Sequence, residues 1–289
     1  MKKLIALLLT LTMIAACFAG CVASEPKDPV ADQTPTGNQT QGSEDVPEDT
    51  KEAAEAVADA EYVANRGKLI VGITEYEPMD YKDEKGEWTG FDAELARKFA
   101  EELEVECEFF VIGDWGKKFI ELETKNIDVV WNGMTITDEA KNNASVSDPY
   151  VVNAQVVVMK ADKIADYADA ESMKDLVVAV EEGSAGQEVA EEAGLNTIAK
   201  QDQAAALMEV KAGTADACVI DITMAKAMTG EGTDYADLAA GISLSSEEYG
   251  VAFRKGSDLT AKWNQFMKDQ KEAGTLEQLA EKYQLTLAE

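Results

Sequence analysis

The chain of 289 residues has no histidine, six prolines and four cysteines, and it carries 26 Lys and Arg against 56 Asp and Glu. Without histidine it can form neither a Ser-His-Asp triad, nor a Cys-His pair, nor a His-ligated metal site. Carboxylates could still hold Ca²⁺, but no D-x-D-x-D-G loop occurs. We therefore expect no metal, no cofactor and no catalytic residue. Cys107 and Cys218 lie in apolar, strand-like runs and are expected to be buried free thiols.

The excess of acidic residues gives a formal net charge of −30. Such a charge disfavours binding to nucleic acid and to anionic lipid headgroups. It would suit a cationic ligand, although a solvated acidic surface is the simpler explanation. The length allows one or two domains, and 46% hydrophobic residues are sufficient for a core.

The N-terminus reads as a targeting segment. It begins with positive charge and continues with an apolar run, Leu4–Ala16, that is too short to span a membrane well. The end of this run resembles a bacterial lipoprotein signal. Residues 1–20 are therefore a predicted signal peptide, and lipid on Cys21 would hold the protein at the outer face of the cell membrane. Cys17 is the alternative lipidation site, but cleavage there would shorten the apolar run.

Residues 21–64 are a predicted acidic tether. From Val22 to about Thr50 the segment is rich in Pro, Thr, Gly, Gln, Ser and acidic residues. It cannot bury enough apolar surface to offset the entropy of ordering, so we expect disorder. Lys51–Asn65 is rich in Ala and Glu and is predicted to be helical. The sequence leaves open whether this helix docks on the body of the protein.

Strands and helices alternate through the rest of the chain, which predicts an α/β fold with largely parallel sheets covered on both faces. The predicted strands are Lys68–Gly72, Val105–Ile112, Ile127–Trp131, Gln155–Met159, Leu176–Val180, Ala217–Ile220 and Tyr249–Phe253. The predicted helices begin near Phe91, Asp114, Thr137, Gly183, Ala204, Leu259 and Leu276, and a hairpin surrounds Glu84-Lys85-Gly86.

One stretch, Ile127–Tyr150, places polar groups at the end of a buried strand. Asn132-Gly133 is expected to break the strand, and Thr137 is a predicted helix N-cap. In α/β sheets, small ligands bind outside the carboxyl ends of strands. The loop after Ile127–Trp131 is therefore a candidate ligand site.

The same stretch carries a family resemblance. NGMTIT and SDPY, together with LIVGITEYEPMDYKDEKGEWTGFDAEL, DWGKKF, VVAVEEGSAGQ and ACVID, resemble the extracytoplasmic solute-binding proteins of ABC importers in the polar amino acid-binding family, family 3. The resemblance implies a type 2 periplasmic-binding-protein fold, in which two Rossmann-like α/β lobes are joined by a two-stranded hinge. It places lobe 1 at 65–154 plus 247–289 and lobe 2 at 155–246, with the ligand in the cleft between them.

The resemblance also implies a function. A monomeric, non-enzymatic protein would bind a small polar solute, an amino acid above all, and deliver it to an ABC permease and its ATPase. An enzyme on the same scaffold is the second hypothesis, but no nucleophile–base pair is visible. A sensory receptor lobe is the third, and it would need a signalling module.

Carried over by position, the resemblance implies a set of ligand-binding residues. Asp221 would take an α-ammonium with Thr135 Oγ1 and the Gly133 carbonyl, although Asp221 could instead cap a helix over 222–228. Ser184 and Ala185, at a glycine-rich turn into a helix, would bind a carboxylate. The remaining predicted ligand-binding residues are Tyr76 and Trp115 as aromatic walls, Met134, and Glu181.

Two positions depart from the family pattern. The family carries an Arg that clamps the ligand carboxylate, and here that position is Ala140; Lys141 points about 100° away around the helix and is a poor substitute. Glu181 lies where relatives have neutral or basic residues. Either backbone N–H groups and hydroxyls hold the carboxylate alone, or the ligand is a cationic amine or a non-standard amino acid, which Glu181 and Glu75 would suit.

Overall fold

The computed structural model describes residues 58–289. The predicted signal peptide, the predicted lipidation site Cys21 and most of the predicted tether lie outside the described residues. No helix within 58–289 is long and apolar enough to cross a membrane.

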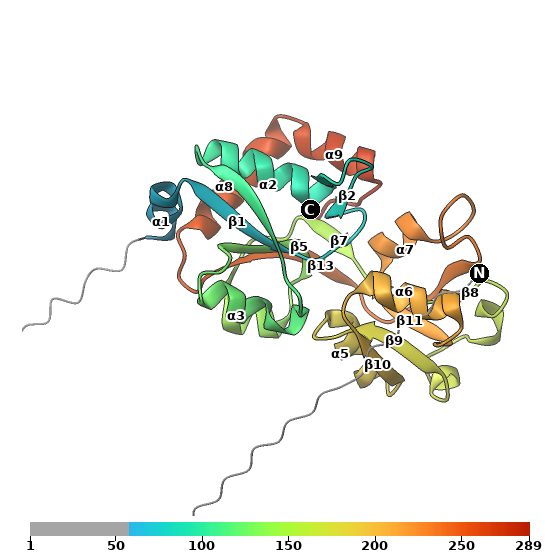
Figure 1. The fold of residues 1–289 in the computed structure, drawn as a ribbon. Coiled ribbons are helices and arrows are strands. Elements are labelled where there is room, and N and C mark those ends of the chain that lie inside the picture. The colour runs from blue at the N-terminus through green and yellow to red at the C-terminus, as the bar shows by residue number, and fades with distance from the viewer. Residues whose placement is uncertain (1–57) are drawn as a thin grey trace, which may run out of the picture. The chain divides into compact units, whose positions relative to one another are not determined.

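The strands of the described chain form two large sheets and a small hairpin (Figure 1). The first sheet, in the order β4-β1-β5-β13-β6 with β7 also paired to β13, consists of β4 (Glu106–Val111), β1 (Lys68–Ile73), β5 (Val129–Thr135), β13 (Glu247–Phe253), β6 (Ser145–Val146) and β7 (Val151–Asn153). The second sheet consists of β10 (Asn196–Lys200), β9 (Val177–Glu181), β11 (Ala217–Asp221), β8 (Gln155–Lys160) and β12 (Leu238–Ser243). The hairpin is formed by β2 (Tyr81–Lys82) and β3 (Trp88–Thr89).

Helices cover both sheets. We call the first sheet with its helices lobe 1 and the second sheet with its helices lobe 2. Lobe 1 carries α1 (Asp59–Arg66), α2 (Phe91–Glu102), the short 3-10 turn η1 (Trp115–Lys117), α3 (Lys118–Glu123), α4 (Asp138–Asn143), α8 (Leu259–Glu272) and α9 (Thr275–Tyr283). Lobe 2 carries η2 (Ile164–Asp166), η3 (Glu171–Met173), α5 (Ala185–Glu192), α6 (Gln203–Ala212) and α7 (Ile222–Met228). The structure confirms the predicted class of fold, with two α/β lobes.

The sheets are mixed, whereas largely parallel sheets were expected. In lobe 1, β4, β1 and β5 run parallel and β13 runs antiparallel to β5. In lobe 2, β10, β9 and β11 run parallel and β8 runs antiparallel to β11. The antiparallel strands β8 and β13 directly adjoin the two places where the chain passes between the sheets. There Asn153 of β7 pairs with Glu247 of β13, so the two passages lie side by side.

The buried strands pack on both faces, which explains why they read as continuous apolar runs. Successive side chains of a strand point to opposite faces. On β5, Trp131 packs edge-on against Phe99 of α2 and Trp263 of α8, with ring centroids 6.2 and 5.5 Å away. Its neighbour Val130 lies in a separate cluster with Leu122 of α3. Figure 1 shows α2 and α3 on opposite sides of this sheet.

One predicted strand end was wrong. Asn132-Gly133 does not break the strand, because β5 continues to Thr135. Gly133 has a φ of 54°, a conformation that glycine adopts without steric cost, and the pairing of β5 with β13 shifts register nearby. The Asn132 side chain accepts from the Thr74 N–H at 3.0 Å. The result is a bulged strand, and the sequence reading also missed the edge strands β10 and β12.

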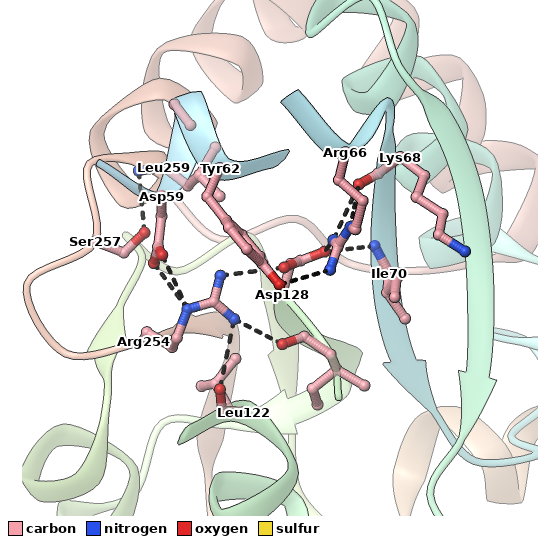
Figure 2. A network of polar contacts seen from close by, with 12 residues as sticks. Asp59, Tyr62, Arg66, Lys68, Ile70, Leu122, Asp128, Arg254, Ser257 and Leu259 are labelled. Carbon is pink, nitrogen blue, oxygen red and sulfur yellow. Dashed lines mark hydrogen bonds and ion pairs between the residues drawn. The ribbon is translucent and has the colours of Figure 1, made fainter. Parts of the chain in front are cut away.

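The helix α1, whose docking the sequence left open, is held on lobe 1 by buried ion pairs (Figure 2). Arg254 donates to Asp59 of α1 at 3.0 Å and to Asp128 at 3.1 Å. Asp128 is completely buried and also pairs with Arg66 at the end of α1. The Ile127 carbonyl accepts from Arg254 at 2.7 Å. The network therefore ties α1 to the residues just before β5.

Arg254→Met should destabilise the protein far more than removal of an exposed lysine. The change leaves Asp59 and the Ile127 carbonyl unpaired and halves the counter-charge of Asp128, so we expect a loss of about 3 kcal/mol in the free energy of unfolding. Lys68→Met is the control, because its pair with Glu108 is exposed and should contribute less than about 1 kcal/mol. Denaturant unfolding would measure both, and equal losses would contradict the assignment.

Candidate functional site

A cavity lies where residues from the two lobes meet. Its lining residues are Thr74, Tyr76, Trp115, Lys118, Asn132, Gly133, Met134, Thr135, Thr137 and Glu139 from lobe 1, and Gln155, Glu181, Gly183, Ser184, Ala185, Glu188, Gln203 and Asp221 from lobe 2. The nine residues that the family resemblance implied for ligand binding are all in this set: Tyr76, Trp115, Gly133, Met134, Thr135, Glu181, Ser184, Ala185 and Asp221. Glu75 is not, because its side chain is exposed outside the cavity.

Asp221 ends strand β11, and its carboxylate is held by side-chain amides. It accepts from Asn153, from Gln155 at 2.8 Å and from Gln203. Asp221 occupies the N-cap position of α7, but its side chain makes no capping hydrogen bond to that helix. Burial raises the pKa of Asp221 to about 7, and the nearby Glu247 carboxylate adds to the shift.

Glu247 is a second carboxylate of this cluster, and the sequence analysis did not find it. One of its oxygens accepts from Thr135 Oγ1 at 2.8 Å and from the Asn153 and Gln155 amides, both at 2.7 Å. Within residues 58–289, no Lys or Arg pairs with Glu247 or Asp221. A hint of a polar cluster was present in the sequence, since Gln155, which donates to both carboxylates, is a polar residue at the start of an apolar strand.

Glu181, at the end of β9, is the least satisfied carboxylate of the cavity. It is 3% exposed, and its Oε1 has no hydrogen-bond partner in the described chain. Burial raises the pKa of Glu181 to about 8, and repulsion from Asp221 and Asp202 contributes. A buried carboxylate without hydrogen-bond partners is stabilised by a cation, or it retains a proton and stays neutral.

The start of α5 forms a different wall of the cavity. Ser184 caps the helix, since its Oγ accepts from the Gln187 N–H at 3.1 Å and donates to the Glu181 carbonyl at 2.8 Å. No acceptor for the Ala185 N–H is present among the described residues. The first N–H groups of a helix lack partners within it and attract anions. This wall can therefore accept a negatively charged group, mainly through backbone donors.

The two predicted aromatic walls come from loops of lobe 1. Tyr76 is 2% exposed, and its hydroxyl bonds to the hydroxyls of Thr223 in α7 and of Tyr249 in β13. Trp115 opens η1, where Asp114 caps the turn by accepting from the Gly116 N–H at 3.1 Å. The Tyr76–Thr223 bond joins lobe 1 to lobe 2.

Asp92 positions the bulge that carries Gly133. The Asp92 carboxylate belongs to the first turn of α2. In the structure it is completely buried and accepts from the Gly133 N–H at 2.7 Å and from the Tyr150 hydroxyl at 2.8 Å. Burial raises the pKa of Asp92 to about 7, against the effect of these donors. The Gly133 carbonyl is thereby fixed beside the cavity.

A small residue, Ala140, stands where the family resemblance led us to expect an arginine. Ala140 is 1% exposed within lobe 1, and Lys141 does not line the cavity. Among the lining residues, Lys118 is the one Lys or Arg. The sequence reading did not single out Lys118, because nothing in the run of DWGKKF distinguishes it from Lys117.

Comparisons with known proteins agree with this geometry. Residues 69–286 match the family described as bacterial extracellular solute-binding proteins, family 3. The arginine-binding extracellular protein ArtP of Bacillus subtilis is 32% identical over 76% of this chain and 87% of its own length. The L-cystine-binding protein TcyJ of Escherichia coli is 30% identical over 76% of this chain and 84% of its own. A crystal structure of a mutant of ArgBP from T. maritima has a TM-score of 0.72 at 33% identity, covering 78% of this chain and 98% of that one.

Glu181→Gln should stabilise the free protein at pH 8 and leave it unchanged near pH 4. A carboxyl group with a pKa near 8 when folded and near its ordinary value when unfolded destabilises the folded state as pH rises between those values. We expect the gain at pH 8 to exceed about 1 kcal/mol, which shifts Tm by ~2–4 °C in a chain of this size.

Glu182→Gln is the matched control for this experiment, because Glu182 is exposed and does not line the cavity. Its Tm should follow that of the unmodified protein at every pH. A pH-independent shift in Glu181→Gln would show that the carboxyl is not the origin of the effect.

Proposed function

Because the chain belongs to the bacterial extracellular solute-binding proteins of family 3, we propose that it captures an amino acid outside the cytoplasm and delivers it to an ABC permease. The cavity between the lobes carries the proposal. It combines buried carboxylates, a helix N-terminus with a free N–H group and two aromatic side chains. A zwitterion needs acceptors for its ammonium and donors for its carboxylate, and this cavity supplies both.

The proposed ligand is a cationic amino acid. Asp221, with Thr135 and the Gly133 carbonyl nearby, would take the α-ammonium, and the turn at Ser184-Ala185 would take the α-carboxylate. Glu181 Oε1 has no partner in the described chain and would pair with a positively charged side chain. Relatives named as arginine-binding support this choice, whereas the cystine-binding relative shows that the family also takes other side chains.

The ligand would be enclosed by closure of the two lobes. Two interlobe contacts support a closed arrangement, namely the Tyr76–Thr223 bond and the approach of the Gly183 turn to Gly116. A ligand that touches both lobes binds the closed state better and shifts the population toward it. Delivery to the permease would then require reopening.

We propose no chemical conversion of the ligand. Ser184 Oγ, a hydroxyl of the cavity, caps α5 and donates to a backbone carbonyl, and no base bonds to it in residues 58–289. Turnover of a bound amino acid, measured by mass spectrometry of the released ligand, would contradict this. The predicted lipid anchor at Cys21 and the monomeric state remain part of the proposal.

A thermal-shift screen of the purified protein tests the ligand class. The panel holds the twenty amino acids, ornithine, cystine, polyamines and betaines. A ligand at a concentration of a hundred times its dissociation constant stabilises the folded protein by about 2.7 kcal/mol. We expect this response from arginine, lysine or ornithine. Response to none of the amino acids would contradict the proposal.

The same screen on two variants tests the role of Glu181. In Glu181→Gln the affinity for cationic ligands should fall about tenfold or more, because a charge-assisted hydrogen bond is lost. Glu182→Gln should bind as the unmodified protein does. Equal affinity of both variants for every ligand would exclude a preference for cations based on Glu181.

Gly183→Ala should weaken ligand binding through closure. A Cβ at Gly183 would lie 2.5 Å from the Gly116 Cα in lobe 1, so the lobes could not approach fully. Gly213→Ala is the matched control, since Gly213 has a similar positive φ of 76° but nothing within 4 Å of an added Cβ. Both variants should lose about 1 kcal/mol of stability, and Gly183→Ala alone should lose affinity in titration calorimetry. Unchanged affinity would mean that this approach is not needed for closure.

A further inference from the structure

The cavity contains one cationic side chain, Lys118, to which the proposed function assigns no role. Lys118 is the first residue of α3, and its side chain is 6% exposed. Among the residues lining the cavity it is the one Lys or Arg. A buried ammonium is costly unless acceptors surround it, so its contacts indicate what it could bind.

Lys118 makes three polar contacts in the described chain, none shorter than 3.2 Å, and its Nζ also lies 5.2 Å from the ring centroid of Trp115 and 4.9 Å from that of Phe119. Its Nζ lies 3.2 Å from the Gly183 carbonyl oxygen, 3.4 Å from that of Trp115 and 3.6 Å from the Glu139 carboxylate. The Glu139 side chain is 57% exposed, so water screens this pair. Burial lowers the pKa of the Lys118 ammonium, although Glu139 and Glu181 oppose the shift. The ammonium therefore retains capacity for an anionic acceptor.

Lys118 lies beside the part of the cavity that already favours anions. The Gly183 carbonyl, which accepts from Nζ, immediately precedes Ser184 and the free N–H of Ala185. An ammonium from lobe 1 and the N-terminus of α5 in lobe 2 thus converge from opposite sides. Ala140 supplies no charge here, so Lys118 is the available cation.

We propose that Lys118 binds the carboxylate of the ligand together with the Ala185 N–H group, in place of the arginine that the family resemblance implies at the position of Ala140. The proposal rests on the proposed function, because it requires a ligand that has a carboxylate. It explains how an acidic cavity without arginine accepts an α-amino acid. It also ties the carboxylate to both lobes, so that the carboxylate promotes closure.

A purely structural role for Lys118 predicts something different. If its bond to Gly183 merely fastened the closed lobes, removal of the ammonium would weaken every ligand alike. If it binds the carboxylate, the loss depends on whether the ligand has one. Ligand pairs that differ only in the carboxylate separate the two roles: L-arginine and agmatine, L-lysine and cadaverine, and L-ornithine and putrescine.

The experiment measures the affinity of these six compounds by titration calorimetry for the unmodified protein, Lys118→Met and Lys117→Met. In Lys118→Met we expect the affinity for whichever of the three amino acids binds to fall roughly 10- to 100-fold. The affinity for the amine paired with that amino acid should change by less than about threefold. Lys117→Met is the matched control, since Lys117 is 61% exposed, pairs with Asp114 and does not line the cavity. It should bind as the unmodified protein does.

The other outcomes overturn the inference in distinguishable ways. Equal losses for an amino acid and its amine, or no loss for either, would overturn the role of Lys118 while the amino acid-binding function stands. Stronger binding of the amines than of the amino acids by the unmodified protein would show that the cavity does not favour a carboxylate. Binding of none of the amino acids would overturn the choice of ligand and this inference together.

Discussion

The cost of burying a carboxylate governs this structure. Asp128 and Asp221 are buried and Glu247 is half-buried beside Asp221, but these carboxylates are satisfied in different ways. Asp128 pairs with the guanidinium groups of Arg66 and Arg254, which neutralise it within the fold. Asp221 and Glu247 receive only neutral amide and hydroxyl donors. The first arrangement holds the scaffold together, and the second leaves negative charge that a ligand can neutralise.

The two arrangements are connected through β5. The Asp128 network fixes the chain just before this strand, and Asp92 holds the Gly133 N–H within it. Between these points Trp131 packs against Phe99 and Trp263. The end of β5, with Thr135, is therefore presented to the cavity from a rigid base. Such preorganisation limits the entropy that ligand binding must overcome.

The lobes contribute unlike parts of the site. Lobe 2 brings Asp221, Glu181 and the N-terminus of α5, whereas lobe 1 brings Tyr76 and Lys118. Lobe 2 presents both acceptors and donors for a zwitterion, and lobe 1 adds an ammonium and an aromatic side chain. Under the proposed function, closure would be coupled to recognition, because a ligand that lacks one charged group would bridge the lobes less well.

The sequence by itself determined the alternation of strands and helices, because buried strands read as apolar runs such as Gln155–Met159. Through its motifs it also determined the family and nine of the residues that line the cavity. It could not show that β5 continues through Gly133, because the bulge depends on pairing with β13 more than a hundred residues later.

Tertiary structure alone decided which charges meet. Glu247 joins Asp221 only because β13 returns beside β7, and Lys118 reaches Gly183 only because the lobes face each other. In the sequence Lys118 and Lys117 are adjacent and alike, and no periodicity separates them. One lies against the opposite lobe and the other in solvent, since a turn of helix directs neighbouring side chains about 100° apart.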